Sequence, residues 1–233
     1  MSLFEELIAK HIKRRDILLQ EQPSQGNGKK TVVKPFITIS REAGSGGKPI
    51  AKAVAKRLGF KLYDKKLIDM TSKKAKKTKA LIETLDEKDR GFIEDLVQSL
   101  LNPDYVSEET YLKNLCQVIL AVARKGNCVI IGRGGNFVAN QYGGLHVRIA
   151  APFLIRAGYT AQYEGYSIYE ARERMKEFDR ERKEFIKKSF GKDPSNANYY
   201  DLVINTTYFN IEQATDVIVE AFKKKFPDWK KYL

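Results

Sequence analysis

The sequence predicts a three-layer α/β fold, in which helices cover both faces of a five-stranded parallel sheet. Five short apolar stretches alternate with segments whose apolar residues recur at helical spacing. One of these stretches, Cys128–Ile131, is apolar without interruption, which is typical of a parallel strand buried on both faces. The chain has 233 residues, enough for one large domain of this class and few for two.

The first strand is expected at Phe36–Ile39, where apolar and β-branched residues predominate. A glycine-rich turn follows, and the next apolar residues, from Ile50 to Leu58, fall on one helical face. Gly59 is well placed to end that helix. Phe60–Tyr63 is the second predicted strand, and it stops at Asp64.

The rest of the chain continues the alternation of strands and helices. Residues 65–101 read as helices with polar breaks, and a helix at Glu109–Lys125 stops at Gly126. Ser167 and Glu170 have capping-box spacing and open a long charged helix towards Lys188. The remaining predicted strands are Cys128–Ile131, Leu145–Ala150 and Leu202–Ile204, and a closing helix carries its apolar stripe from Ile211 to Phe222.

Residues 1–30 are predicted to lie outside the main domain, which occupies residues 31–233. Leu3, Leu7, Ile8 and Ile12 recur at helical spacing among charges and indicate an amphipathic helix. A polar linker with Pro and Gly follows. The helix suits packing against the domain or a contact in a homodimer, and membrane binding is a weaker alternative.

The composition gives a net charge of +13, from 42 Lys and Arg against 29 Asp and Glu. Such a surplus attracts nucleotide phosphates, nucleic acid or anionic lipid. The two lysine clusters, 73–79 and 223–225, lack the interleaved aromatics of a nucleic-acid platform, so we expect nucleotides rather than nucleic acid. No stretch is long enough to span a membrane, and no apolar leader is present. With Cys116 and Cys128 read as reduced core thiols, these features predict a cytoplasmic protein.

The turn after the first strand carries five residues that suit phosphate binding, Gly44, Ser45, Gly46, Gly47 and Lys48. Glycines let the backbone approach phosphate oxygens, and free N–H groups at the helix start point towards them. Lys48 is positioned to reach the outer phosphates. The usual motif, Gly-x-x-x-x-Gly-Lys-Ser/Thr, is matched imperfectly, because Glu42 and Pro49 replace its first glycine and its hydroxyl.

From the turn alone, a tight turn without a ligand is an equally good interpretation. A dinucleotide site is disfavoured, since the spacing is not Gly-x-Gly-x-x-Gly, although Asp64 falls near the distance expected of a ribose-binding acid. Arg133, between Gly132 and Gly134, follows the third strand. Loops at the carboxyl ends of parallel strands form the ligand crevice, so Arg133 and Asp64 are expected at its rim. Asp64 also suits the N-cap of the next helix.

A further group of charges lies later in the chain. Arg156 follows Ala151-Pro152, and the helix towards Lys188 carries Asp179 and Arg182. Taken alone, that helix suits a solvated charged face. In a phosphoryl-transfer enzyme the same arginines would neutralise charge on the transferred group when a lid closes.

Together these residues resemble the cytidylate kinase-like family of P-loop kinases, over about Phe36 to Phe222. The segments that carry the resemblance are Ile37–Glu42 with Gly44–Gly47, Tyr63–Ile68, Val129–Gly134, Ala151–Arg156, Asp179 with Arg182, and Tyr200–Thr206. The resemblance implies a P-loop NTPase fold with a helical lid at about residues 153–195. It also implies ATP and Mg²⁺ as cofactors, and phosphoryl transfer to a CMP-type or dCMP-type acceptor.

The resemblance assigns roles to individual residues. Gly44, Ser45, Gly46, Gly47 and Lys48 would hold ATP. Arg41, Asp64, Arg133 and Asp179 would face the acceptor. Lys48, Arg133, Arg156 and Arg182 would carry catalysis.

Two departures separate the chain from cytidylate kinases themselves. Pro49 stands where they carry the metal-binding Ser or Thr, and Gly134 stands where they carry an Asp after Gly-Arg. The metal ligands therefore stay open. A nucleotide-binding protein that has lost catalysis and a kinase of another small metabolite stay open as alternatives, and a nucleic-acid-binding protein is the third.

Overall fold

Five parallel strands form one sheet in the order β2-β3-β1-β4-β5. The computed structural model describes residues 34–100 and 109–233. The strands are β1 (Ile37–Arg41), β2 (Lys61–Tyr63), β3 (Cys128–Ile131), β4 (Leu145–Ala150) and β5 (Leu202–Asn205). Because every strand runs the same way, their carboxyl ends meet at one edge of the sheet, where ligands bind in folds of this class.

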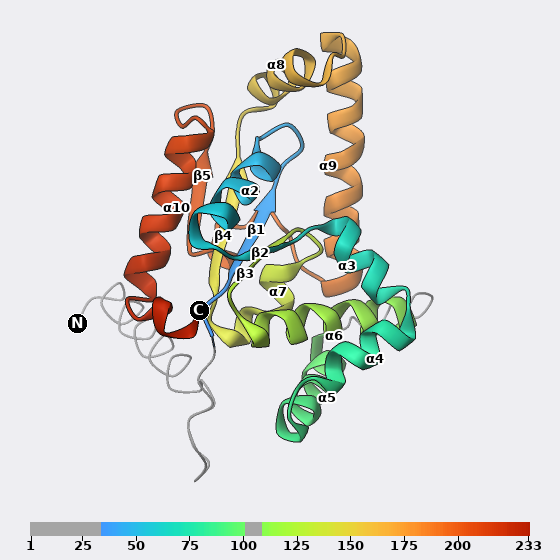
Figure 1. Ribbon diagram of the computed structural model, residues 1–233. Helices are drawn as coiled ribbons and strands as arrows, with labels where there is room; N and C mark the ends of the chain where they lie inside the picture. Colours follow the sequence, from blue (N-terminus) through green and yellow to red (C-terminus); the bar gives the residue numbers. More distant parts are fainter. Residues whose placement is uncertain (1–33, 101–108) are drawn as a thin grey trace, which may run out of the picture. The chain divides into compact units, whose positions relative to one another are not determined.

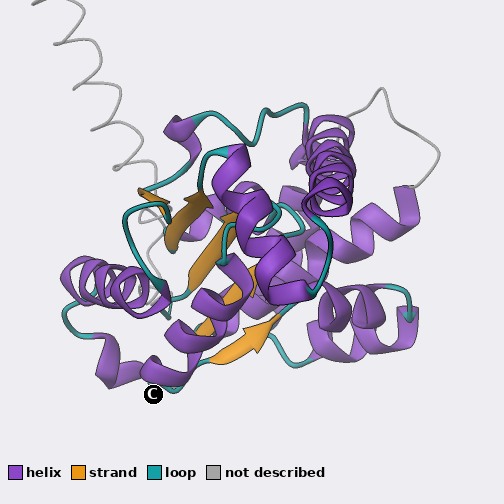
Figure 2. Ribbon diagram, turned by 90° about the horizontal axis from the view of Figure 1, so that it is seen from above, coloured by secondary structure: helices purple, strands orange, loops and turns teal. Residues whose placement is uncertain are grey.

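Helices cover both faces of the sheet, which makes three layers (Figures 1 and 2). On one face α2 (Gly47–Leu58) and α10 (Ile211–Lys225) pack together against Ile37, Ile39 and Val147. On the other face α6 (Glu109–Lys125) packs against Cys128 and Ile130. Three shorter helices, α3 (Lys65–Ser72), α4 (Ala75–Glu83) and α5 (Glu87–Leu100), pack on α6, and α7 (Gly135–Val138) lies against β1.

The helical lid is a hairpin of α8 (Phe153–Glu164) and α9 (Ile168–Phe190). Figure 1 shows α8 above the turn that joins β1 to α2 and α9 running down beside the domain. The capping box predicted at Ser167 is confirmed, since both reciprocal hydrogen bonds with Glu170 are present. The far end of α9 is anchored by Ile186 and Phe190, which are buried in the core beside α6 and α7.

The predicted order of strands and helices is confirmed, while several bounds differ from those predicted. Strand β1 runs on to Arg41, so that residue ends the strand instead of beginning the turn. Helix α2 begins at Gly47, three residues before its apolar face starts. Helix α7 was not predicted, because it is a single turn. Helix α8 lies inside the predicted helical lid, but its bounds were not predicted, because it exposes many of its apolar side chains, including Leu154 and Tyr163.

The predicted helix and linker of residues 1–30 lie outside the described residues and stay a prediction. Within the part of the chain that is described, no helix is both long and apolar enough to cross a membrane. Cys116 and Cys128 are free thiols in the core, as predicted, and burial raises the pKa of each to about 12.

Candidate active site

A cavity of about 440 Å³ opens at the carboxyl edge of the sheet, between the ends of β1 and β3 and one side of α9. Its cationic lining side chains are Arg41, Lys65, Arg133, Arg148, Arg182 and Lys183, and its acidic ones are Glu42, Asp179, Glu181 and Asp193. Cations thus outnumber acids six to four. The cavity suits an anionic ligand of moderate size.

Arg41 is a partly buried cation of this cavity. Burial, followed by the nearby charges of Arg182 and Arg133, lowers the pKa of Arg41 to about 10, while Asp64 partly opposes this shift. The guanidinium lies directly against the backbone of Gly132, where any side chain would collide with it. Arg182 donates a hydrogen bond of 3.2 Å from Nη1 to the carbonyl oxygen of Arg41. These arginines repel one another, so an anion placed between them would be stabilised.

Arg133 is held in a fixed position rather than left free. Its backbone adopts a left-handed conformation with φ of 54°, which is uncommon for a residue with a side chain. Its Nε donates to Asp69 Oδ1 at 2.8 Å, and its Nη2 donates to the other carboxylate oxygen. The guanidinium also lies over the Phe185 ring, 5.2 Å from its centroid. The sequence analysis did not identify Asp69 as the partner of Arg133. Its position on the helix after β2 was the only feature of the sequence that pointed to it.

The turn between β1 and α2 presents unpaired backbone donors. Gly46 caps the helix in a left-handed conformation with φ of 76°, and Gly47 is the first helical residue. Among the described residues, the N–H groups of Gly46, Gly47 and Lys48 have no hydrogen-bond acceptor. Free N–H groups at a helix start attract phosphate. The turn therefore has the donors expected of an anion site, next to the cationic cavity.

Lys48 and Ser45, which the sequence predicts to hold ATP, do not line the cavity. Lys48 is exposed, lines no part of the cavity and contacts no charged partner among the described residues. The Ser45 hydroxyl is buried, and it donates to the carbonyl oxygens of Glu42 at 2.9 Å and Ile149 at 3.3 Å. The oxygen of Ser45 thus faces the protein interior rather than the open side of the turn.

Asp179 and Arg156 tie the lid to the turn. Asp179 accepts a hydrogen bond of 2.8 Å from the backbone N–H of Ala43 through Oδ1, and one of 2.7 Å from Arg156 Nη1 through Oδ2. Arg156 is only 6% exposed and also donates to the carbonyl oxygens of Ala43 and Ala151. Its Nε lies 3.3 Å from Glu42 Oε2. The hairpin of α8 and α9 is therefore fastened to the turn between β1 and α2 through buried and partly buried charges.

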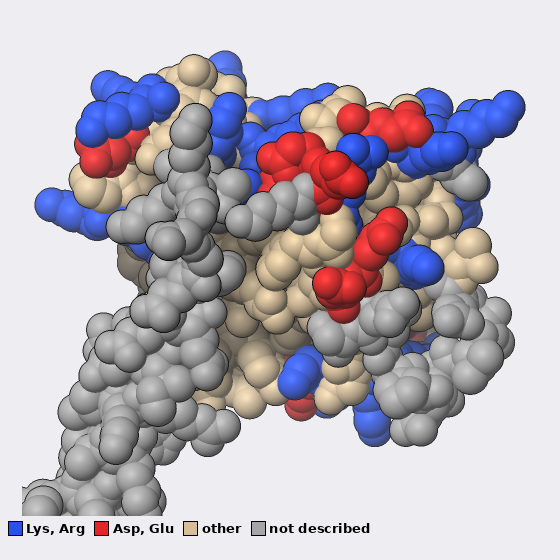
Figure 3. Space-filling view, turned by 90° about the horizontal axis from the view of Figure 1, so that it is seen from below, with Lys and Arg blue, Asp and Glu red and all other residues tan. Residues whose placement is uncertain are grey.

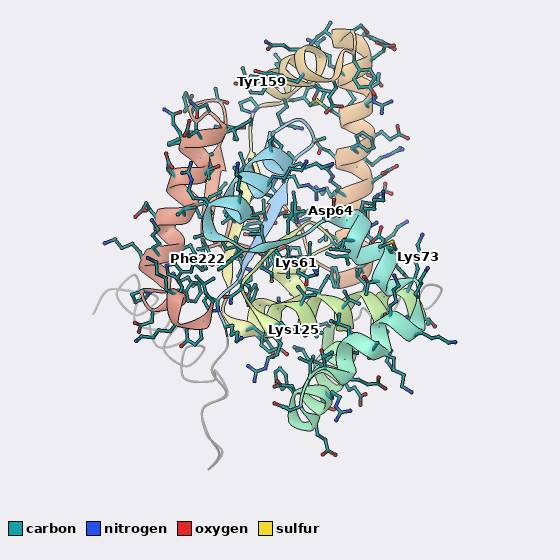
Figure 4. All side chains as sticks on the ribbon, in the orientation of Figure 1. Lys61, Asp64, Lys73, Lys125, Tyr159 and Phe222 are labelled. Atoms are coloured by element: carbon teal, nitrogen blue, oxygen red, sulfur yellow. The ribbon has the colours of Figure 1, made fainter. Side chains whose placement is uncertain are left out.

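The carboxylates beside the turn are already bonded to other groups of the protein. Glu42 accepts from Arg148 Nη2 at 2.8 Å and from the backbone N–H of Ala151 at 3.2 Å, in addition to its contact with Arg156. Asp64 caps α3, as predicted, by accepting from the N–H of Leu67 at 2.9 Å, and Figure 4 labels it where β2 passes into α3. No group of three or more possible metal-ligating side chains occurs among the described residues. The residues beside the turn therefore do not fit a site in which the protein itself holds Mg²⁺.

Comparisons with known proteins agree with this geometry. Residues 36–208 match the cytidylate kinase-like family. A cytidylate kinase of Ignicoccus hospitalis is 29% identical over 186 residues, which cover 78% of this chain and 95% of that protein. A cytidylate kinase of Archaeoglobus fulgidus is 32% identical over 194 residues, which cover 81% of this chain and 95% of that protein.

Among solved structures, an uncharacterized protein from Eubacterium ventriosum is similar to this chain with a TM-score of 0.66. Its sequence is 22% identical, and the alignment covers 82% of this chain and 99% of that one. At this identity the likeness concerns the fold alone. The fold match and the family match each extend over most of the chain.

Proposed function

The chain belongs to the cytidylate kinase-like family, and we propose on that premise that it transfers the γ-phosphoryl group of ATP to a small phosphate-bearing acceptor. A CMP-type or dCMP-type nucleoside monophosphate is the acceptor that the relatives' names favour. The observation that carries the proposal is the meeting of free backbone donors and a cationic cavity at one edge of the sheet.

The donor phosphates would lie on the turn from Gly44 to Lys48, where the N–H groups at the start of α2 point at them. Phosphoryl transfer asks little covalent chemistry of the protein, so catalysis rests on positioning and on neutralising charge. Mg²⁺ would come bound to ATP itself, where it would offset phosphate charge. Since the nearby carboxylates are bonded to arginines and backbone amides, we assign no residue of this chain to the metal.

The acceptor would occupy the cavity beside Arg133. Asp69 and Phe185 fix that guanidinium from α3 and α9, so it meets an acceptor phosphate without first being ordered. Arg182 contributes positive charge from the lid helix, where burial lowers its pKa most and Asp179 partly restores it. A phosphate acceptor carries its own nucleophilic oxygen, so no protein base is required.

Two residues of the hairpin of α8 and α9, Asp179 and Arg156, would affect how the lid closes over ATP. Asp179 holds the Ala43 N–H and Arg156 at once, so an incoming phosphate would compete with a carboxylate for one donor of the turn. The family resemblance assigns Arg156 to catalysis and Asp179 to the acceptor, and we keep both as proposals. In this geometry Arg156 reaches the donor only if its bonds to Asp179 and Glu42 give way.

A nucleotide-binding protein without turnover is the second candidate. The specific observation in its favour is that Ser45 Oγ is committed to two carbonyl oxygens and that Pro49 carries no hydroxyl. A protein that binds nucleic acid receives less support. On the face shown in Figure 3, acidic side chains are interspersed with the Lys and Arg side chains.

The test is acceptor-dependent formation of ADP. Wild-type protein with ATP and Mg²⁺ is screened against CMP, dCMP, UMP, AMP and GMP and against phosphorylated and free small metabolites. We expect turnover with a pyrimidine monophosphate and a loss of about 10²–10³-fold in Arg133→Ala. Arg57→Ala serves as the matched control, because Arg57 is an exposed arginine of α2 paired with Asp216 and Glu212 away from the cavity. ATP binding with no turnover on any acceptor would favour the second candidate.

A further inference from the structure

We propose that Arg41 supplies the positive charge over the donor phosphates, in place of the lysine that phosphate-binding loops usually carry at the helix start. This inference rests on the proposed function and deepens it by naming the cation of the donor site. From the sequence alone, that role falls to Lys48, and Arg41 is expected at the acceptor. The position of the helix start leads to the opposite assignment.

The register of the motif depends on which glycine ends the loop. The usual lysine directly follows the last loop glycine, and both Gly46 and Gly47 could be that glycine. In the structure Gly46 is the left-handed cap, and Gly47 already belongs to α2. With Gly46 as the last loop residue, the lysine position is Gly47, the hydroxyl position is Lys48, and the first glycine position is Arg41.

The side chains of positions 41 and 47 would compete for one space. A Cβ added to Gly47 would lie 2.5 Å from Arg41 Cβ and 2.9 Å from Arg41 Cγ, which is too close for both. The stem of Arg41 therefore covers the first residue of α2, where a lysine side chain would otherwise start. The chain has a glycine at the helix position and a long cationic side chain at the end of β1.

The guanidinium of Arg41 is well placed for a transferred phosphoryl group. Its stem lies over the helix start, and its tip lies against Gly132 at the end of β3, so it reaches from the donor loop to the acceptor cavity. Glu42, the next residue, is neutralised by Arg148 and Arg156 and so adds little negative charge beside the phosphates. Lys48 is exposed and lines no part of the cavity.

The experiment separates donor binding from acceptor binding and from turnover. Dissociation constants for ATP and for CMP are measured by calorimetry in wild type, Arg41→Ala and Lys48→Ala. We expect Arg41→Ala to weaken ATP by about 10-fold to 100-fold and to cut turnover by about 10²–10³-fold. Lys48→Ala should weaken ATP binding less than Arg41→Ala does, because the Lys48 side chain lines no part of the cavity. Arg57→Ala, at an exposed arginine paired away from the cavity, should match wild type. Arg41→Lys, which keeps a charge at this position, guards against a loss of folding and should lie between wild type and Arg41→Ala.

A double substitution gives the sharpest test. Gly47→Lys alone should destabilise the protein, because its Cβ meets Arg41, whereas Arg41→Gly with Gly47→Lys restores the usual arrangement. We expect the double variant to regain ATP affinity that Arg41→Gly loses. Unchanged ATP affinity in Arg41→Ala, or weakened CMP binding alone, overturns the inference, as does a larger loss in Lys48→Ala. If wild type turns over no acceptor, the proposed function fails while the ATP measurements still decide the role of Arg41.

Discussion

Gly44, in the turn between β1 and α2, packs against α8, and its replacement by alanine tests that packing. Gly44 has φ of 71°, and a Cβ there would lie 2.6 Å from Thr160 Oγ1 and 2.8 Å from the carbonyl oxygen of Arg156. The left-handed backbone costs about 1–2 kcal/mol for a residue with a Cβ. Overpacking against the α8 backbone adds about 1–3 kcal/mol. We therefore expect Gly44→Ala to lose about 2–5 kcal/mol of unfolding free energy.

Two control glycines separate the cost of backbone strain from the cost of overpacking. Gly165 is also left-handed, with φ of 77°, but a Cβ added there would meet no atom within 4 Å, so Gly165→Ala should lose only about 1–2 kcal/mol. Gly158 is helical and equally open, so Gly158→Ala should gain about 0.5–1 kcal/mol. Chemical denaturation followed by circular dichroism measures all three. A loss in Gly44→Ala no larger than in Gly165→Ala would refute the close contact between the turn and α8.

Two further predictions concern buried charge. Asp69→Asn should release Arg133 and raise the KM for the acceptor by about 10-fold while leaving ATP affinity unchanged, as steady-state kinetics would show. Asp89→Asn breaks a comparably buried pair with Arg124 outside the cavity, so it should lower stability without changing that KM; an equal KM effect would count against a role for Asp69 in positioning. Burial lowers the pKa of His146 to about 4, with Asp201 opposing the shift and Lys225 adding to it. The part of the unfolding free energy that depends on neutral His146 is therefore fully present above pH 6.5 and is lost as the pH falls towards 4. Between pH 7 and pH 5 the unfolding free energy should fall by about 2 kcal/mol from this source. In denaturation experiments a His146→Gln variant should lack this pH dependence, and a pH dependence equal to that of wild type would contradict the assignment to His146.

The order of the elements could be predicted from the sequence because local signals agreed with the fold. The helix at Glu109–Lys125 was bounded correctly, since its apolar stripe ends at a glycine. Ser167 and Glu170 are three residues apart, so the capping box needed no tertiary information. Strand β3 was recognisable because both of its faces are buried.

The details of the site depend on contacts between distant residues, which periodicity does not report. Ala43 and Asp179 are 136 residues apart, and Arg133 and Asp69 are 64 apart. Neither pair has a local pattern. The choice between Gly46 and Gly47 as the last loop glycine was also undecidable from spacing, because it depends on one backbone angle and on where Arg41 points.

We propose that one edge of the sheet brings ATP and a phosphate acceptor together for direct transfer. The most direct measurement incubates wild-type protein with γ-labelled ATP, Mg²⁺ and CMP and follows the label by mass spectrometry. We expect labelled CDP in amounts equal to the ADP formed, and we expect it to be lost in Arg133→Ala but not in Arg57→Ala. Label released only as inorganic phosphate, or retained in ATP with CMP and with every other acceptor tested, would contradict it.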